Sequence, residues 1–401
     1  MRILFTGLSG VRHDEVRSNL LDYILEKTTY RKRDIISKDI GNILINDEGI
    51  DWFNFLEAED TDWQNRKCRS ATEKAVDEIN DREPEVAMLS THLCMFRNSR
   101  IFTPIDWELI GQFSPDYTIT LIDDIYTIQS RINNREKSGS TTESYLRLRE
   151  LLTWRSVETL MTDRLVKYLR SHSHDVIDNY LVAVKHPSSM LYKLLFSSNP
   201  IVYAGSSISE PRKSEEGIEE VNRFRKKLHT SFPSFDPTTI DEGILKWKFF
   251  DENDILKDEY KDKEHVELCK EDRWPLHFEG YSPLCDDENE FPIKLRIEEI
   301  EEVALPVSDN SKSDIYNQIR TRDYRLIDQS DFLAGYRPYY LGKSSTGLTS
   351  ELNYVKSNAH IPPIVVHKEE DGNWGGHPFS NPAIRTDSID ELVTEIENRG
   401  R

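Results

Sequence analysis

The fold of the second half of this chain is decided by the stretch Ile201-Val202-Tyr203-Ala204-Gly205-Ser206-Ser207-Ile208. Its apolar start predicts a buried strand, and its small residues predict a tight turn that leads into a helix. Such a turn leaves backbone N–H groups and hydroxyls free for a ligand at the carboxyl edge of a parallel sheet. We therefore expect ligand contacts from Gly205, Ser206 and Ser207, and from Arg212 in the loop that follows.

Alternating strand and helix patterns continue from this stretch to the end of the chain. Residues 214–229 carry apolar side chains at helical spacing, which gives one buried face made of Ile218, Val221, Phe224 and Leu228. Apolar runs at 331–338 and 361–367 each follow a further helical pattern. This rhythm predicts a mostly parallel sheet covered by helices.

The first half of the chain shows the same alternation. Apolar runs at 2–8, 85–91 and 117–124 are each followed by a segment with helical spacing. A long helix and another apolar run, at 179–186, come after them. We predict a second parallel sheet covered by helices, built by this half alone.

The length of the chain and a break in its pattern predict two domains. With 401 residues the chain exceeds a typical single domain, and Ser197-Ser198-Asn199-Pro200 interrupts the alternation. The predicted fold class is α/β, with domains at 1–198 and 199–401. A stretch near 242–310 is rich in acidic and aromatic residues without clear periodicity, so we predict an insertion there.

Charge and composition narrow the classes of partner. The net charge is −20, and acidic runs such as 251–262 would repel a nucleic-acid backbone. No stretch approaches the roughly 18 consecutive apolar residues that cross a bilayer. The start of the chain lacks the apolar core of a signal peptide, and the four cysteines are scattered without CxxC spacing. We expect a cytoplasmic protein that has no membrane or polymeric nucleic-acid partner.

Acidic residues and a hydroxyl-rich loop accompany the Gly-Ser turn. Asp323 and Asp331 lie eight residues apart around a predicted helix-to-strand junction, and 345–352 forms a loop that enters a helix. Together with Tyr203 and the Gly-Ser turn, these features resemble the nucleoside deoxyribosyltransferase superfamily, especially its 5′-monophosphate N-glycosidases. The resemblance covers roughly 200–368, apart from the predicted insertion.

The resemblance implies a site for cleaving or exchanging the base of a nucleotide. Tyr203, Gly205 and Ser206 or Ser207 would surround the sugar and phosphate, and Glu351, six residues after Ser345, would be the nucleophile. A carboxylate suits this role because N-glycosidic cleavage passes through an oxocarbenium-like state. Asp323 would position a sugar hydroxyl or protonate the departing base. Asp331 would contact the ligand or fix the loop, and no cofactor or metal is required.

The loop before Glu351 favours a phosphorylated substrate. Ser344, Ser345 and the Gly347 amide can donate hydrogen bonds to a 5′-phosphate, which an acidic residue at 345 would repel. We also expect the helix dipole to favour the ionised form of Glu351, which we assign to the first turn of its helix. Each residue has a structural explanation as well: Ser345 as a helix cap, Glu351 as a first-turn acid, Asp323 as a solvated helix residue.

The chain begins with the layout of a phosphate-binding loop. A strand is followed by Gly7-Leu8-Ser9-Gly10-Val11 and then by a helix. Arg12, His13 and Asp14 stand where a competent loop has Gly-Lys-Ser/Thr. Without the lysine, phosphoryl transfer is not expected. Nucleotide contacts are assigned to the loop through Gly7, Ser9, Gly10 and Arg12, for ATP or a similar nucleotide with Mg²⁺.

Scattered residues of this half resemble the archaeal-type adenylate kinase group. They are Thr91-His92, Phe102 to Pro104, the run 113–124, Ile128 with Arg131, and Trp154-Arg155. The resemblance covers most of residues 1–185, and it implies that Arg131 and Arg135 face a phosphate. Solvated helical arginines are the structural alternative.

The leading hypothesis is an enzyme that acts on the N-glycosidic bond of a small-molecule nucleotide, with a first domain that senses or recruits a nucleotide. One alternative is a regulatory nucleotide-binding protein that has lost catalysis in both halves. Another is an active nucleotide kinase fused to the glycosidase-like domain. The family resemblance also implies a homo-oligomer.

Overall fold

The computed structural model divides the chain into two compact units. Unit 1 comprises Met1–Val184, Asp262–Glu267 and Ile293–Leu305; unit 2 comprises Lys185–Lys261, Leu268–Pro292 and Pro306–Arg401. The structure describes residues 1–400 except 98–99, 138–144, 174–175, 276–289, 309–310, 359–361, 377–379 and 381–382. It also leaves undescribed the side chains of 52, 53, 57, 135–137, 173 and 376.

Unit 1 is built on a five-stranded sheet in the order β2-β3-β1-β6-β7, in which all neighbours are parallel. Its strands are β1 (Arg2–Gly7), β2 (Ile35–Asp39), β3 (Val86–Ser90), β6 (Tyr117–Ile122) and β7 (Asp178–Ala183). β4 (Met95–Arg97) and β5 (Arg100–Phe102) form a small antiparallel pair, and β10 (His265–Leu268) pairs with β11 (Ile293–Arg296). The apolar runs predicted as strands in this half are therefore strands of one parallel sheet.

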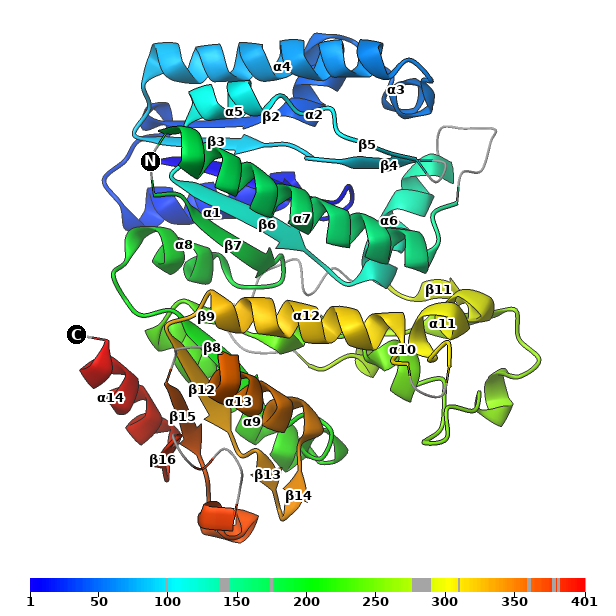
Figure 1. Cartoon of the computed structure of the whole chain (residues 1–401), viewed down its shortest axis with the longest axis vertical. Helices are drawn as coiled ribbons and strands as arrows, with labels where there is room; N and C mark the ends of the chain where they lie inside the picture. The colour runs from blue at the N-terminus through cyan, green and yellow to red at the C-terminus, as the bar shows by residue number, and fades with distance from the viewer. Residues whose placement is uncertain are drawn as a thin grey trace. The chain divides into compact units, whose positions relative to one another are not determined.

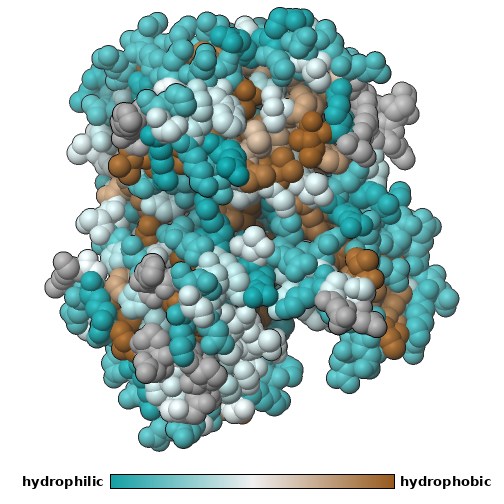
Figure 2. All heavy atoms as spheres, viewed as in Figure 1, coloured by the Kyte–Doolittle hydropathy of each residue, from teal (hydrophilic) through white to brown (hydrophobic). Residues whose placement is uncertain are grey.

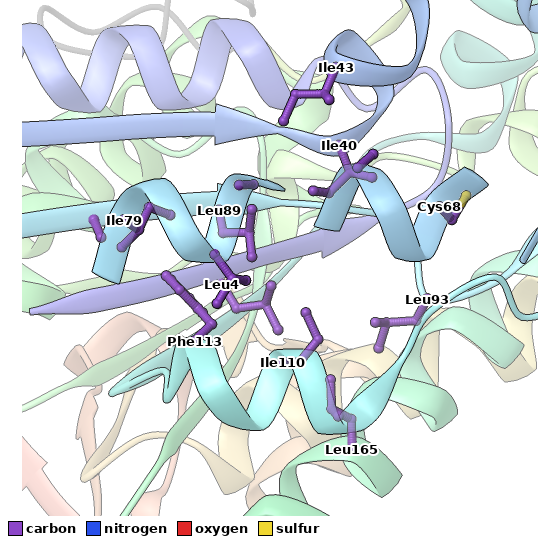
Figure 3. Packing of buried hydrophobic residues seen from close by; sticks show 14 of the residues in the cluster. Leu4, Ile40, Ile43, Cys68, Ile79, Leu89, Leu93, Ile110, Phe113 and Leu165 are labelled. Atoms are coloured by element: carbon purple, nitrogen blue, oxygen red, sulfur yellow. The ribbon is translucent and has the colours of Figure 1, made fainter. Parts of the chain in front are cut away.

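Helices flank this sheet, as Figure 1 shows. The helices of unit 1 are α1 (His13–Lys27), α2 (Ile40–Asn42), α3 (Trp52–Glu57), α4 (Thr61–Arg82), α5 (Trp107–Phe113), α6 (Ile125–Lys137), α7 (Leu148–Ser173) and α11 (Ile297–Ala304). Leu4 of β1 packs in one cluster with Ile79 of α4, Phe113 of α5 and Leu165 of α7 (Figure 3). Since side chains alternate along a strand, its buried neighbours Ile3 and Phe5 point to the opposite face.

Unit 2 also contains a five-stranded parallel sheet, in the order β16-β15-β12-β8-β9. The strands are β8 (Val202–Ser206), β9 (Ser234–Phe235), β12 (Phe332–Tyr336), β15 (Pro363–Val366) and β16 (Ile384–Thr386). A short hairpin, β13 (Tyr339–Tyr340) with β14 (Lys343–Ser344), follows β12. The chain leaves β8 for β9 on one side and later returns to β12 on the other, so the strand order reverses between β8 and β12. Ligands of open parallel sheets bind at such a reversal.

The helices of unit 2 are α8 (Ser188–Phe196), α9 (Glu215–Ser231), α10 (Ile244–Trp247), α12 (Asp314–Asp328), α13 (Thr346–Asn358) and α14 (Ile389–Arg399). Val221, Phe224 and Leu228 of α9 are fully buried in the core cluster with β8, β12 and β15, as their helical spacing predicted. Ser214 caps α9 by accepting a hydrogen bond from the Gly217 N–H, at 3.1 Å. The mixed α/β class with two parallel sheets is thus confirmed.

The units differ from the predicted domains at two places. Residues 185–198 belong to unit 2, where Lys193 Nζ donates to the His229 and Thr230 carbonyls, each at 2.6 Å. Parts of the predicted insertion belong to unit 1, because Glu299 of α11 accepts hydrogen bonds from Gln129 (2.7 Å) and from the Leu148 N–H (3.2 Å). Contacts between segments so distant in sequence leave no local pattern.

The outer surface is mainly hydrophilic. Figure 2 shows hydrophilic residues over most of the visible face, with smaller hydrophobic areas between them. Within the described ranges, no helix has both the length and the apolar character needed to cross a bilayer.

Candidate functional site

The end of β8 forms the floor of a cavity in unit 2. Tyr203 is fully buried, and Gly205 pairs in register with Gly335 of β12, at the carboxyl ends of both strands. A Cβ on Gly205 would lie 2.8 Å from Leu348 Cδ1 and 3.0 Å from Glu351 Oε2. No side chain fits there, so glycine lets the Glu351 carboxyl rest against the backbone of β8.

Glu351 is held in α13 with only 9% of its surface exposed. Burial, and then the nearby charge of Asp323, raise the pKa of Glu351 to about 8, while a hydrogen bond with Tyr203 and the charge of Arg322 oppose the rise. The expectation of a first-turn, ionised glutamate is wrong on both counts. Glu351 is the sixth residue of α13, beyond the first turn where the dipole acts, and desolvation dominates.

The buried proton of Glu351 predicts a distinctive dependence of stability on pH. The unfolded chain releases this proton near the ordinary value of 4.5 and the folded chain near 8, so the free energy of unfolding falls as pH rises between these values. Between these pH values, the free energy of unfolding falls by about 1.4 kcal/mol for each pH unit. We expect Glu351→Gln to match the wild-type melting temperature near pH 4.5 and to exceed it at pH 8.5, by several degrees. Calorimetric melts across this range measure the effect; parallel curves would contradict the buried proton.

Asp323 of α12 faces the same cavity and is 8% exposed. Its Oδ1 accepts hydrogen bonds from Arg322 Nε (3.0 Å) and Nη2 (2.9 Å). Burial raises the pKa of Asp323, and the ion pair with Arg322 works against this rise. Of the two acids, Asp323 therefore ionises with more support from its surroundings.

Arg322 is a site residue that the sequence interpretation missed. Its guanidinium is buried and also donates to the carbonyls of Ile240 (3.3 Å) and Pro237 (3.4 Å). These hydrogen bonds fix the Arg322 guanidinium in the orientation that pairs with Asp323. An arginine in an amphipathic helix is usually solvated, so its neighbour Asp323 was the only signal for it.

Unsatisfied polar atoms mark the deep end of the cavity. The Tyr203 hydroxyl, Ser206 Oγ and Glu351 Oε2 are all buried and make no hydrogen bond of standard geometry among the described residues. The Tyr203 phenol nevertheless lies close enough to Glu351 that burial and this carboxyl raise the pKa of Tyr203 well above its ordinary value. Buried polar groups without partners are costly, so these atoms are arranged for a polar ligand.

The cavity has a volume of about 610 Å³ and brings together most of the predicted residues of this half. Those that line it are Ser206, Ser207, Arg212, Asp323, Ser344, Ser345, Gly347 and Glu351. Tyr203 lies behind Glu351 and Gly205 beneath it. Two acidic side chains and a row of hydroxyls, distant in sequence, therefore share one cavity.

The hydroxyl-rich side of this cavity is the start of α13. Ser345 Oγ accepts a long hydrogen bond from the Leu348 N–H, at 3.4 Å, so the capping explanation also holds. Lys343 and Lys213 flank Glu210 at 3.1 and 2.7 Å, and hydrogen bonds from Lys213 and then Lys343 lower the pKa of Glu210. The hydroxyls and helix N–H groups on this side suit an anion. Lys213 lines the cavity together with its partner Glu210, and Lys343 reaches Glu210 from outside the lining.

Two predicted ligand residues are engaged in other interactions. Asp331 accepts a hydrogen bond from the Ile201 N–H at 2.7 Å and does not line the cavity. Because Asp331 precedes β12, it lies at the amino edge of the sheet, opposite the site. Arg212 lines the cavity but forms an ion pair with Asp241 at 2.7 Å.

The glycine loop of unit 1 connects β1 to α1. Gly7 and Gly10 adopt φ values of 144° and 88°, and the Gly7 N–H donates to Glu158 Oε1 at 3.1 Å. Glu158 also accepts hydrogen bonds from the N–H groups of Leu93 (2.9 Å) and Cys94 (2.8 Å). This buried carboxyl therefore ties the loop to the segment after β3.

Side chains of the loop itself turn towards Gly7. A Cβ on Gly7 would lie 3.0 Å from His13 Nε2 and 3.2 Å from Val11 Cγ2. Burial, followed by the neighbouring His92, lowers the pKa of His13 to about 3, so the imidazole is neutral at physiological pH. The position of the usual lysine thus carries no positive charge.

The arginines assigned to a nucleotide are held by protein atoms. Arg12 has a left-handed φ of 61° and pairs with Glu15 at 3.1 Å. Arg131 donates to the Gly10 carbonyl at 2.7 Å and pairs with Asp123 at 2.8 Å, so it is not a solvated arginine. Ser9 is half-buried in the loop, and the side chain of Arg135 lies outside the described part.

Among the described residues, no group of three or more His, Cys, Asp or Glu side chains is arranged to hold a metal ion. Comparison with known proteins adds no family: no protein-family model matches the chain, and a search of curated proteins found no match.

Proposed function

We propose that unit 2 cleaves or exchanges the N-glycosidic bond of a small nucleotide, with Glu351 as the nucleophile. The observation that carries this proposal is the meeting of Glu351 and Asp323 in one cavity beside the buried Tyr203 hydroxyl and the buried Ser206 Oγ. The strand order supports it as well. Read from β9 to β16, the strands follow the doubly wound order 2-1-3-4-5, whose ligands bind at the reversal where Gly205 lies.

The proposed reaction has two steps. A carboxylate oxygen of Glu351 bonds to the anomeric carbon, while the electron pair of the broken C–N bond leaves with the base, which takes up a proton from the solvent. Water or a second base then attacks the same carbon, gives up a proton to the solvent and releases Glu351 as the carboxylate. Oδ2 of Asp323 is free to hold a sugar hydroxyl, since Arg322 occupies Oδ1. Hydrolysis and base exchange differ only in the second acceptor.

A 5′-phosphate on the substrate is the next part of the proposal. We expect kcat/KM for a nucleoside 5′-monophosphate to exceed that for the matching nucleoside at least tenfold, because charge-assisted hydrogen bonds from the start of α13 and Lys343 would stabilise the phosphate. Lys343→Met should reduce this ratio several-fold and leave the nucleoside rate unchanged. Chromatography of the released base measures both. Equal rates with and without the phosphate would contradict this assignment.

The direct test incubates the whole chain with a panel of nucleoside monophosphates and follows the free base. Nucleotide binding without base release would instead favour the regulatory alternative. For unit 1 we infer nucleotide contact without phosphoryl transfer, supported by the neutral His13 at the lysine position. ATP-dependent phosphorylation of AMP or CMP would overturn this inference and support the kinase alternative.

A further inference from the structure

One wall of the cavity is apolar and comes from the start of the predicted insertion and the residues just before it. Ile240, Gly243 and Trp247 line it, and Ile319 of α12 lies across from them. Trp247 is 42% exposed although its neighbour Ile240 is buried. This side contrasts with the hydroxyls at the start of α13, so the cavity has one apolar side and one anion-binding side.

The indole of Trp247 is held in place by charged neighbours. The Arg212 guanidinium lies 4.1 Å from the centroid of the Trp247 ring and 5.4 Å from that of Trp274. Asp241 pairs with Arg212 at 2.7 Å and accepts a hydrogen bond from the backbone N–H of Trp274 at 3.0 Å. Cation–π contact and the ion pair therefore fix the aromatic wall before any ligand arrives.

Gly243 leaves a narrow gap in this wall. Its backbone is helical, with φ −57° and ψ −23°, one turn before Trp247. A Cβ on Gly243 would lie 3.6 Å from Trp247 Nε1 and 3.9 Å from Ile319 Cδ1, both ordinary van der Waals distances. A carbon atom at this point would be in van der Waals contact with both Trp247 and Ile319, so glycine keeps open the space beside these two side chains.

We propose that this gap, the Gly243 slot, binds the base of the substrate as a planar heteroaromatic ring stacked between Trp247 and Ile319. The inference rests on the proposed function and adds the orientation of the substrate. With the base in the slot and the phosphate at Ser344 and Ser345, the sugar lies between them. Stacking is tolerant of base identity, because every base presents a π-face.

Gly243→Ala is the decisive variant. Alanine suits a helical φ and meets no atom closer than van der Waals contact, so the variant should fold, yet its methyl group fills the slot. Gly375→Ala, whose Cβ would approach only Asn373 Oδ1 at 3.7 Å outside the cavity, is the matched control. Trp247→Leu removes the aromatic face and gives a second route to the same test.

Calorimetry should use three probes on the full chain: free adenine, AMP and ribose 5-phosphate. We expect Gly243→Ala to weaken adenine and AMP at least tenfold, to leave ribose 5-phosphate within twofold, and Gly375→Ala to change none of the three. Unchanged base affinity in Gly243→Ala, or an equal loss for ribose 5-phosphate, would overturn the slot.

Failure of the slot is distinct from failure of the proposed function. If the wild type binds bases in the slot but releases none from any nucleotide, the result supports the slot and refutes the proposed catalysis. If the wild type releases base and Gly243→Ala does so with the same KM, catalysis stands and the slot falls.

Discussion

Glu351→Gln should lower the rate of base release at least about 1,000-fold, as expected when a nucleophile is lost. Glutamine keeps the size of the side chain against Gly205 but has no carboxylate oxygen to bond with the anomeric carbon. Folding is not at risk, because the wild-type carboxyl is itself neutral below about pH 8. The measurement is release of free base from the preferred monophosphate under saturating substrate.

Glu216→Gln is the control for this experiment, since Glu216 is exposed in the first turn of α9 and away from the cavity. It should retain wild-type activity. Base release that persists in Glu351→Gln at more than a few per cent of the wild-type rate would refute the nucleophile assignment. The proposal would then have to move the attack to water, with Glu351 in another role.

The second large effect is a steep rise of kcat/KM with pH. A nucleophilic Glu351 acts as the carboxylate, and its pKa is raised to about 8 by burial and by Asp323. Well below that value the active form falls about tenfold per pH unit, and half of it is present at pH 8, so we expect a kcat/KM about 50-fold lower at pH 6 than at pH 8. Initial rates at low substrate concentration from pH 5.5 to 9.5 measure this profile.

A kcat/KM that falls with rising pH would assign Glu351 a different role in the reaction. If Glu351 donated its proton to the departing base, kcat/KM would be constant at low pH and would fall as the pH rises above 8. A nucleophilic Glu351 instead makes kcat/KM rise with pH up to about 8. Asp323→Asn separates the two acids further, because removing the Asp323 charge lowers the pKa of Glu351. The rising limb should therefore shift to lower pH in that variant, even where its maximum rate is reduced.

Much of the architecture was predictable because the strands of both sheets are continuous apolar runs. The run at 201–205 became β8, and the helical spacing in 214–229 became α9 with its Ser214 cap. Glu351 follows β12, so its place near the carboxyl edge of the sheet was a topological consequence. Asp323 belongs to the helix before β12, and its meeting with Glu351 was expected from the family resemblance alone.

Other features depend on the tertiary structure and could not be read locally. Trp247 and Arg322 acquire their roles from residues far along the chain, and the only local signal was Asp323 beside Arg322. The protonated state of Glu351 follows from desolvation, which spacing does not reveal. The assignment of Asp331 to the ligand site could have been avoided. A residue directly before a strand lies at the amino edge of the sheet, whereas the site lies at the carboxyl edge.

The carboxyl of Glu158 has a consequence for how unit 1 responds to its surroundings. Gly7, Leu93 and Cys94 direct their N–H groups to this one internal acceptor. The glycine loop is therefore held by a side chain of the same chain, which is always present, and not by a bound ligand. Some proteins lose structure when a bound phosphate leaves. We expect this part of the molecule to keep its structure when no nucleotide is bound.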